Sequence, residues 1–148
     1  MRREKAINEW PVIVLDFDRT LDHGPGDNDI NPAAREFILE NQDKATFVIV
    51  SANGSRSTIE DALEDAGIAQ HIDRINHDTG DKEDEFNDIA EIYGTDNNRF
   101  FFFDDRQSNI ESWMDSDLAG DNNYLLVSNG GSDGGTASDF DKIEAWIG

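Results

Sequence analysis

The sequence predicts a single-domain α/β protein: a parallel, Rossmann-like sheet of about five strands with helices on both faces. Three observations support this fold class. Short aliphatic and aromatic runs lack polar alternation, as expected for strands that are buried on both faces of a parallel sheet. These runs alternate with stretches of helical composition. The length of 148 residues suits one compact domain.

The first strand covers residues 12–15 and leads directly to Asp16 and Asp18, with Thr20 just behind them. The glycine- and aspartate-rich segment 22–29 predicts a polar loop. Asn31-Pro32 then supplies a helix N-cap followed by proline at the first helical position, which predicts a helix through about residue 41.

The later elements continue the alternation. The run 46–50 predicts a second strand that ends at Ser51. The remaining elements are expected in this order: a helix over 57–66 closed by Gly67, a short strand over 72–75, a helix from the cap residue Asp81 to Tyr93 closed by Gly94, a strand over 99–103, a helix over 108–114, a strand over 124–127 and a final helix over 139–147. The Gly/Ser segment 128–138 predicts a flexible connection, so the core covers about 11–127.

The composition is strongly acidic, with 33 acidic against 12 basic residues and a net charge of −21. Such self-repulsion is a feature of halophilic proteins, and molar salt screens it. We therefore expect a protein adapted to high salt; the alternative is an acidic protein from an ordinary habitat. No apolar stretch reaches the ~20 residues of a membrane span, and no signal region follows the basic start, so we expect a cytoplasmic protein without a membrane partner. The absence of cysteine excludes disulfides and thiolate metal sites.

Polar groups follow three predicted strands at their carboxyl ends, where open α/β sheets bind ligands. These groups are Asp16 with Asp18, Ser51, and Asp104 with Asp105. Neighbouring carboxylates repel each other unless a cation compensates, and Mg²⁺ binds one or two carboxylates together with phosphate oxygens. The sequence thus predicts a Mg²⁺ site that acts on a phosphorylated substrate.

The residues also suggest a reaction. A carboxylate such as Asp16 can act as a nucleophile and form an aspartyl-phosphate. Asp18, two residues further along the strand, could protonate the leaving group and then activate water. Lys82 lies at the start of a predicted helix, where its charge opposes the helix dipole. That position favours a functional role, although a surface ion pair remains an alternative. The acidic run 81–91 around it is interpreted as a solvated helix face.

Four segments together resemble the motifs of the haloacid dehalogenase-like (HAD) phosphotransferase superfamily. They are Asp16-Phe-Asp-Arg-Thr20, the strand ending in Ser51, Gly80-Asp-Lys82, and Asp104-Asp105 with Asn109. The resemblance implies a phosphatase, because the phosphatases of this superfamily carry an aspartate at the second position of the first motif. It also implies a chain without a cap domain, because the segments between the motifs are short.

The resemblance further implies roles for individual residues. The metal ligands would be Asp16, the main-chain carbonyl of Asp18, and Asp105, with Asp104 and Asn109 as auxiliary residues. The substrate phosphate would be held by five residues that lie beside these ligands: Thr20, Ser51, Ala52, Asn53 and Lys82.

The substrate is left open between several classes. Ile30-Asn-Pro32 and Asp104-Asp-Arg106 resemble the 3′-phosphatase domain of bacteriophage polynucleotide kinase-phosphatase, which implies a nucleic-acid 3′ end or a nucleotide as substrate. The alternatives are a small metabolite, a phosphoprotein, or a catalytically silent binding module. Arg19 stands where the family has a small residue, and Ser51-Ala-Asn-Gly lacks the usual arginine, which Arg56 could replace. The net charge also opposes nucleic-acid binding.

Overall fold

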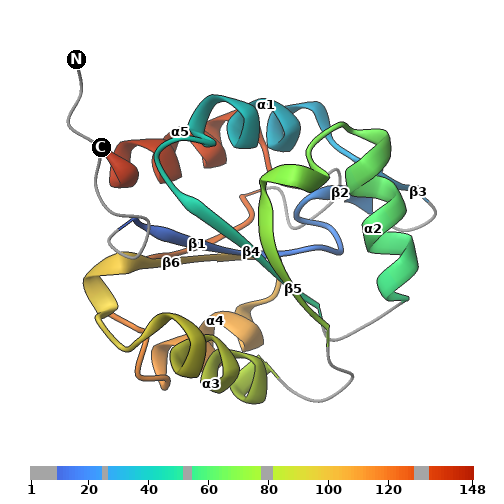
Figure 1. Cartoon of the computed structure of the whole chain (residues 1–148). Helices are drawn as coiled ribbons and strands as arrows, with labels where there is room; N and C mark the ends of the chain where they lie inside the picture. Colours follow the sequence, from blue (N-terminus) through green and yellow to red (C-terminus); the bar gives the residue numbers. More distant parts are fainter. Residues whose placement is uncertain (1–9, 25–26, 52–54, 78–81, 129–133) are drawn as a thin grey trace.

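The computed structural model describes residues 10–24, 27–51, 55–77, 82–128 and 134–148. The predicted fold class is confirmed, because a five-stranded parallel sheet forms the centre of the molecule in the order β5-β4-β1-β6-β7 (Figure 1). The strands are β1 (Val12–Asp16), β4 (Thr46–Ser51), β5 (Ile72–His77), β6 (Phe100–Asp104) and β7 (Tyr124–Leu126).

Helices cover both faces of this sheet (Figure 1). One face carries α1 (Pro32–Asn41), α2 (Arg56–Asp65) and α5 (Ala137–Ile147), and the other carries α3 (Lys82–Tyr93) and α4 (Gln107–Met114). Two short 3₁₀ turns, η2 (Ala69–His71) and η3 (Asn97–Arg99), precede β5 and β6. None of the helices in the described ranges is both long and apolar enough to span a membrane.

The central strand β1 packs into both halves of the core. Ile13 and Leu15 join the cluster under α1, α2 and α5, whereas Val12 and Val14 join the cluster under α3 and α4. This alternation follows from the two-residue period of a strand. Because β4 and β6 flank β1 in parallel, the carboxyl ends of all three strands meet at one edge. The polar residues after these strands are therefore brought together.

The segment after β1 differs from the expected loop. It contains an antiparallel hairpin of β2 (Asp22–Gly24) and β3 (Asp27–Ile30). Asn31 closes the hairpin base, because its side-chain amide donates to the carbonyls of Thr20 and Leu21 at 3.2 and 3.1 Å. The sequence did not reveal these strands, since they contain almost none of the β-branched residues that mark a strand.

Helix ends mostly agree with the capping signals. The Asn31 side chain accepts a hydrogen bond from the Ala34 amide at 2.8 Å, and Gly67 adopts the left-handed φ of 74° at the predicted end of α2. The final helix starts two residues earlier than expected. Thr136 is its N-cap and forms a capping box with Asp139. The predicted cap Asp81 lies outside the described residues, as do residues 129–133 of segment 128–138.

A segment near the end of the chain supports the turn after β1. The Gly135 amide donates to the Thr20 carbonyl at 2.7 Å. Gly134 adopts a φ of 78°, and a Cβ atom there would lie 2.2 Å from the Asp22 carbonyl oxygen. Only glycine allows so close an approach between two backbones.

Candidate active site at the carboxyl edge of the sheet

Asp16 occupies the centre of the carboxyl edge, at the end of β1, and only 6% of its surface is exposed. Its Oδ1 accepts a hydrogen bond from Lys82 Nζ at 3.0 Å. Its Oδ2 accepts one from the Thr20 hydroxyl at 3.3 Å. Both oxygens of the candidate nucleophile are thus oriented by buried donors.

Lys82 reaches this edge from the first position of α3 and is buried. Besides Asp16, its ammonium group donates to the Val50 carbonyl at 3.1 Å. It also lies 3.7 Å from a Glu85 oxygen and 3.8 Å from Asp104 Oδ2. A surface ion pair is therefore excluded as the explanation for this lysine.

Asp104, the last residue of β6, and Asp105, the next residue, complete the edge. Asp104 is fully buried and accepts hydrogen bonds from the Arg106 amide at 2.9 Å and from the Asn109 side chain at 3.1 Å. Asp105 is partly exposed. One ligand oxygen from each of Asp16, Asp104 and Asp105 lies within 4.8 Å of the others. Both acids thus approach Asp16, although the sequence favoured Asp105 as the ligand.

This group of residues has more negative than positive charge. Burial raises the pKa of the Asp16 carboxyl well above its usual value; Lys82 counteracts this, whereas Asp104 and Asp105 add to it. Burial likewise raises the pKa of Asp104 to about 6, despite Lys82. Burial alone would lower the pKa of Lys82, but the neighbouring carboxylates, Asp16 foremost, outweigh it and raise that pKa. Oxygen donors with uncompensated charge fit a hard divalent cation.

The other predicted site residues, which are the phosphate ligands and Asp18, are only partly described. Ser51 is buried at the end of β4, and Asp18 is partly exposed. Thr20 is fully buried, with its hydroxyl directed at Asp16. Ala52 and Asn53 lie outside the described residues.

Three arginines that the sequence analysis singled out follow strands at this edge, and all three are exposed: Arg19, Arg56 and Arg106. Arg19 has a left-handed φ of 60°, and its amide donates to Asp22 Oδ1 at 2.6 Å. Arg56 donates to the Ile75 carbonyl at 3.2 Å. Arg106 contacts Asp104 through its backbone.

Sequence reasoning missed Glu85, because the run around it was interpreted as a solvated face. Glu85 is fully buried below Lys82. The helical period was the available signal: Lys82, Glu85, Phe86 and Ile89 are spaced i, i+3, i+4, i+7 and are all buried. The acid therefore lies on the inner face of α3.

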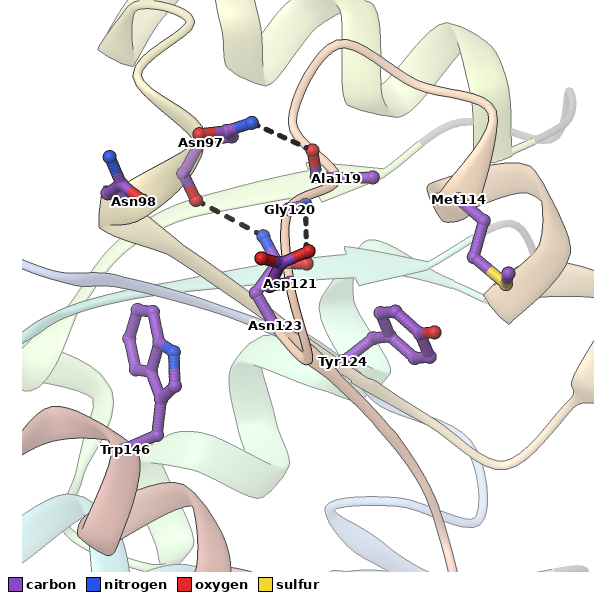
Figure 2. A pocket seen from close by; sticks show the side chains of 9 residues that line it. All are labelled: Asn97, Asn98, Met114, Ala119, Gly120, Asp121, Asn123, Tyr124 and Trp146. Carbon is purple, nitrogen blue, oxygen red and sulfur yellow. Dashed lines mark hydrogen bonds between the residues drawn. The ribbon is translucent and has the colours of Figure 1, made fainter.

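A pocket of about 540 Å³ lies elsewhere, beside the start of β7 and the end of α5 (Figure 2). Two of its polar side chains bind the protein itself: Asn97 donates to the Ala119 carbonyl, and Asn123 accepts from the Gly120 amide. None of the predicted site residues lines it, so we assign it no catalytic role.

Comparison with known proteins yields matches in structure only. No family model and no curated protein matches the sequence. A structure from Bacteroides fragilis, the N-terminal part of a protein containing a phosphatase domain complexed with Mg, superposes with a TM-score of 0.66 at 11% identity. The match covers 94% of this chain but only 40% of that chain.

Two further structures match over most of both chains. The cobalt-bound deoxy-D-mannose-octulosonate 8-phosphate phosphatase of Haemophilus influenzae gives a TM-score of 0.62 at 13% identity, covering 95% of this chain and 88% of the other. A candidate HAD-family hydrolase from Streptomyces avermitilis gives 0.59 at 15%, covering 98% and 88%. The chain therefore has the fold of HAD-type phosphatases.

Proposed function

We propose that this chain is a metal-dependent phosphomonoester hydrolase with Asp16 as the nucleophile. The observation that carries the proposal is the arrangement around Asp16: a buried lysine on one oxygen, and two further acids within reach of a shared cation. The fold shared with HAD-type phosphatases agrees with it. Burying this excess of carboxylates costs stability, which a cation at a catalytic site would offset.

The reaction has two steps. An Asp16 oxygen attacks phosphorus, the bond to the ester oxygen breaks, and the leaving alkoxide takes a proton from Asp18. Water then attacks the phosphorus of the aspartyl-phosphate, Asp18 accepts its proton, and inorganic phosphate leaves with Asp16 restored. Lys82 and Ser51 stabilise the negative oxygens of the phosphoryl group.

Asp16, Asp104 and Asp105 would hold the cation, with Mg²⁺ as the proposed ion. When bound, it would neutralise carboxylate charge and polarise the phosphoryl group. Thr20 and Lys82 hold Asp16 in place for attack. Nucleic-acid ends and nucleotides remain the predicted substrates, with metabolites and phosphoproteins as alternatives.

The test measures phosphate release from 3′-phosphorylated oligonucleotides, nucleotides and sugar phosphates, in molar KCl with Mg²⁺. Asp16→Asn should abolish turnover. Asp18→Asn should slow it by ~10²–10⁴-fold and allow a phospho-enzyme to accumulate. Asp61→Asn, on the exposed side of α2, is the matched control and should retain full activity. Full activity in Asp16→Asn would disprove the mechanism, and no release from any substrate would favour the silent binding module.

A further inference from the structure

Basic residues gather at the carboxyl edge of the sheet, although the chain is strongly acidic. Three of its twelve basic residues precede Trp10, outside the described part, which leaves nine. Four of these nine follow the carboxyl ends of four neighbouring strands, one per strand: Arg19 after β1, Arg56 after β4, Lys82 after β5 and Arg106 after β6. Four of the nine described basic residues thus follow strand ends at the edge where the candidate active site lies.

The buried lysine and the exposed arginines differ in their contacts. Lys82 is engaged with Asp16 and its neighbours. The guanidinium groups of Arg19 and Arg106 have no partner among the residues that the structure describes. Arg56 is more than half exposed, with the Ile75 carbonyl at 3.2 Å and a Glu60 oxygen at 3.5 Å. The arginines are therefore accessible to a group outside the Asp16 site.

These arginines follow strands that lie side by side in the sheet. Adjacent strands are ~4.8 Å apart, and β4, β1 and β6 are consecutive in the sheet. Arg19 and Arg106 follow directly paired strands, with Arg56 on the other side of β1. All three therefore follow strands that end at the same edge as Asp16, with the Arg56 side chain directed to the Ile75 carbonyl of β5.

Arg19 also adopts an unfavourable backbone conformation. Its φ of 60° lies in the left-handed region, where a non-glycine residue costs ~1–3 kcal/mol. Glycine would adopt this turn without strain. A long cationic side chain at a strained position next to Asp18 is consistent with a role for that side chain.

Charge balance shows why an anion would need these arginines. Even with a divalent cation bound, the four carboxylates Asp16, Asp104, Asp105 and Glu85 exceed the charge of the cation and Lys82 by one. Asp18 adds a further acid. An approaching phosphate would be repelled unless the three exposed arginines offset this charge.

We infer that Arg19, Arg56 and Arg106 select phosphomonoesters that carry a second phosphate beside the reacting one. The inference rests on the proposed function and deepens it. Lys82 serves the reacting phosphate, and guanidinium groups are well suited to bind the second, because their planar donors match phosphate oxygens. Nucleoside bisphosphates and 3′-phosphorylated nucleic-acid ends share this chemistry.

The test compares kcat/KM for a nucleoside 3′,5′-bisphosphate, a 3′-phosphorylated dinucleotide and a nucleoside 3′-monophosphate at one fixed salt concentration. The wild type should prefer the two substrates with a second phosphate. Each single change of Arg19, Arg56 or Arg106 to Gln should reduce that preference by ~2–5-fold, and the triple variant should abolish it. Lys142→Gln, on α5, removes the same charge from an exposed position and should leave the preference unchanged. The two preferred substrates distinguish a nucleotide from a nucleic-acid end.

A second measurement separates this inference from the proposed function. Calorimetry on Asp16→Asn measures binding of the bisphosphate and the monophosphate without turnover, with and without the three arginine changes. A binding preference that the arginine changes remove supports the inference even if no hydrolysis is ever observed. Hydrolysis by the wild type without any preference, or a preference that survives the triple change, overturns the inference and leaves the hydrolase proposal standing.

Discussion

Replacing Lys82 by methionine removes the cation that lies among the buried carboxylates. The side chain keeps similar volume, so the change is mainly electrostatic. Lys82 Nζ lies 3.0 Å from Asp16, 3.7 Å from Glu85 and 3.8 Å from Asp104. Removing one partner of a buried ion pair costs ~3–5 kcal/mol, because the remaining charges stay desolvated. We expect a loss of this size in the free energy of unfolding at pH 8.

The loss should depend on pH, because the carboxyl groups can take up protons instead. Burial already raises the pKa of Asp104 to about 6, and its pKa should rise further without Lys82. The folded variant then binds more protons than the unfolded chain, so its stability falls as pH increases through the raised pKa. Each extra proton changes stability by ~1.4 kcal/mol per pH unit. The loss at pH 5 should therefore be less than half that at pH 8.

Urea unfolding in molar KCl with EDTA, at both pH values, measures this difference. Mg²⁺ should recover part of the stability at pH 8, since it supplies positive charge to the same carboxylates. Lys142→Met serves as the control on an exposed site and should change stability by less than ~0.5 kcal/mol. If Lys82→Met loses equal stability at pH 5 and pH 8, the buried charge excess is not what Lys82 compensates. If the variant is unfolded at pH 8, its free energy of unfolding can be measured at pH 5 and then at increasing pH.

Three further predictions concern the rest of the molecule. Gly134→Ala should destabilise the fold more than Gly67→Ala. Both glycines have a positive φ, but only a Cβ atom at position 134 would meet a carbonyl, that of Asp22. Equal losses of stability in thermal unfolding would contradict the close approach. The melting temperature should rise between ~0.1 M and molar KCl as salt screens the net charge of −21, and a flat profile would remove the case for salt adaptation. Without metal, wild-type stability should fall as pH rises through about 6, where Asp104 ionises; Mg²⁺ should reduce that fall, which calorimetry at pH 5 and pH 8 would detect.

Local signals predicted most of the fold correctly. Asn31-Pro32 marks the start of α1, because the asparagine side chain accepts a hydrogen bond from an amide of the first turn. Gly67 marks the end of α2, because glycine readily adopts the left-handed φ of that position. The apolar strands were visible because burial on both faces leaves no polar alternation. The β2–β3 hairpin was not visible, since its own residues have little strand propensity and the hydrogen bonds of Asn31 to two carbonyls at its base join residues ten or more positions apart.

The candidate site was predictable where it follows strand ends. Asp16, Ser51 and Asp104 could be placed together because parallel strands share an edge. Glu85 was missed because its charge was given more weight than its helical position. Its ion-pair partner Lys82 lies one turn earlier in the same helix, so the pair could have been found from the i, i+3 spacing in the sequence.

The contact between Gly135 and Thr20 has a consequence for how the protein is made. The Thr20 carbonyl, four residues after Asp16, receives its hydrogen bond from a residue translated more than a hundred positions later. Strand β6, which brings Asp104 to Asp16, also emerges late from the ribosome. A nascent chain that already displays Asp16 therefore lacks both the carboxylate partner and the support of the turn that follows Asp16. The proposed activity should accordingly appear only near the end of synthesis, when the segment at residues 134–135 reaches the turn after β1.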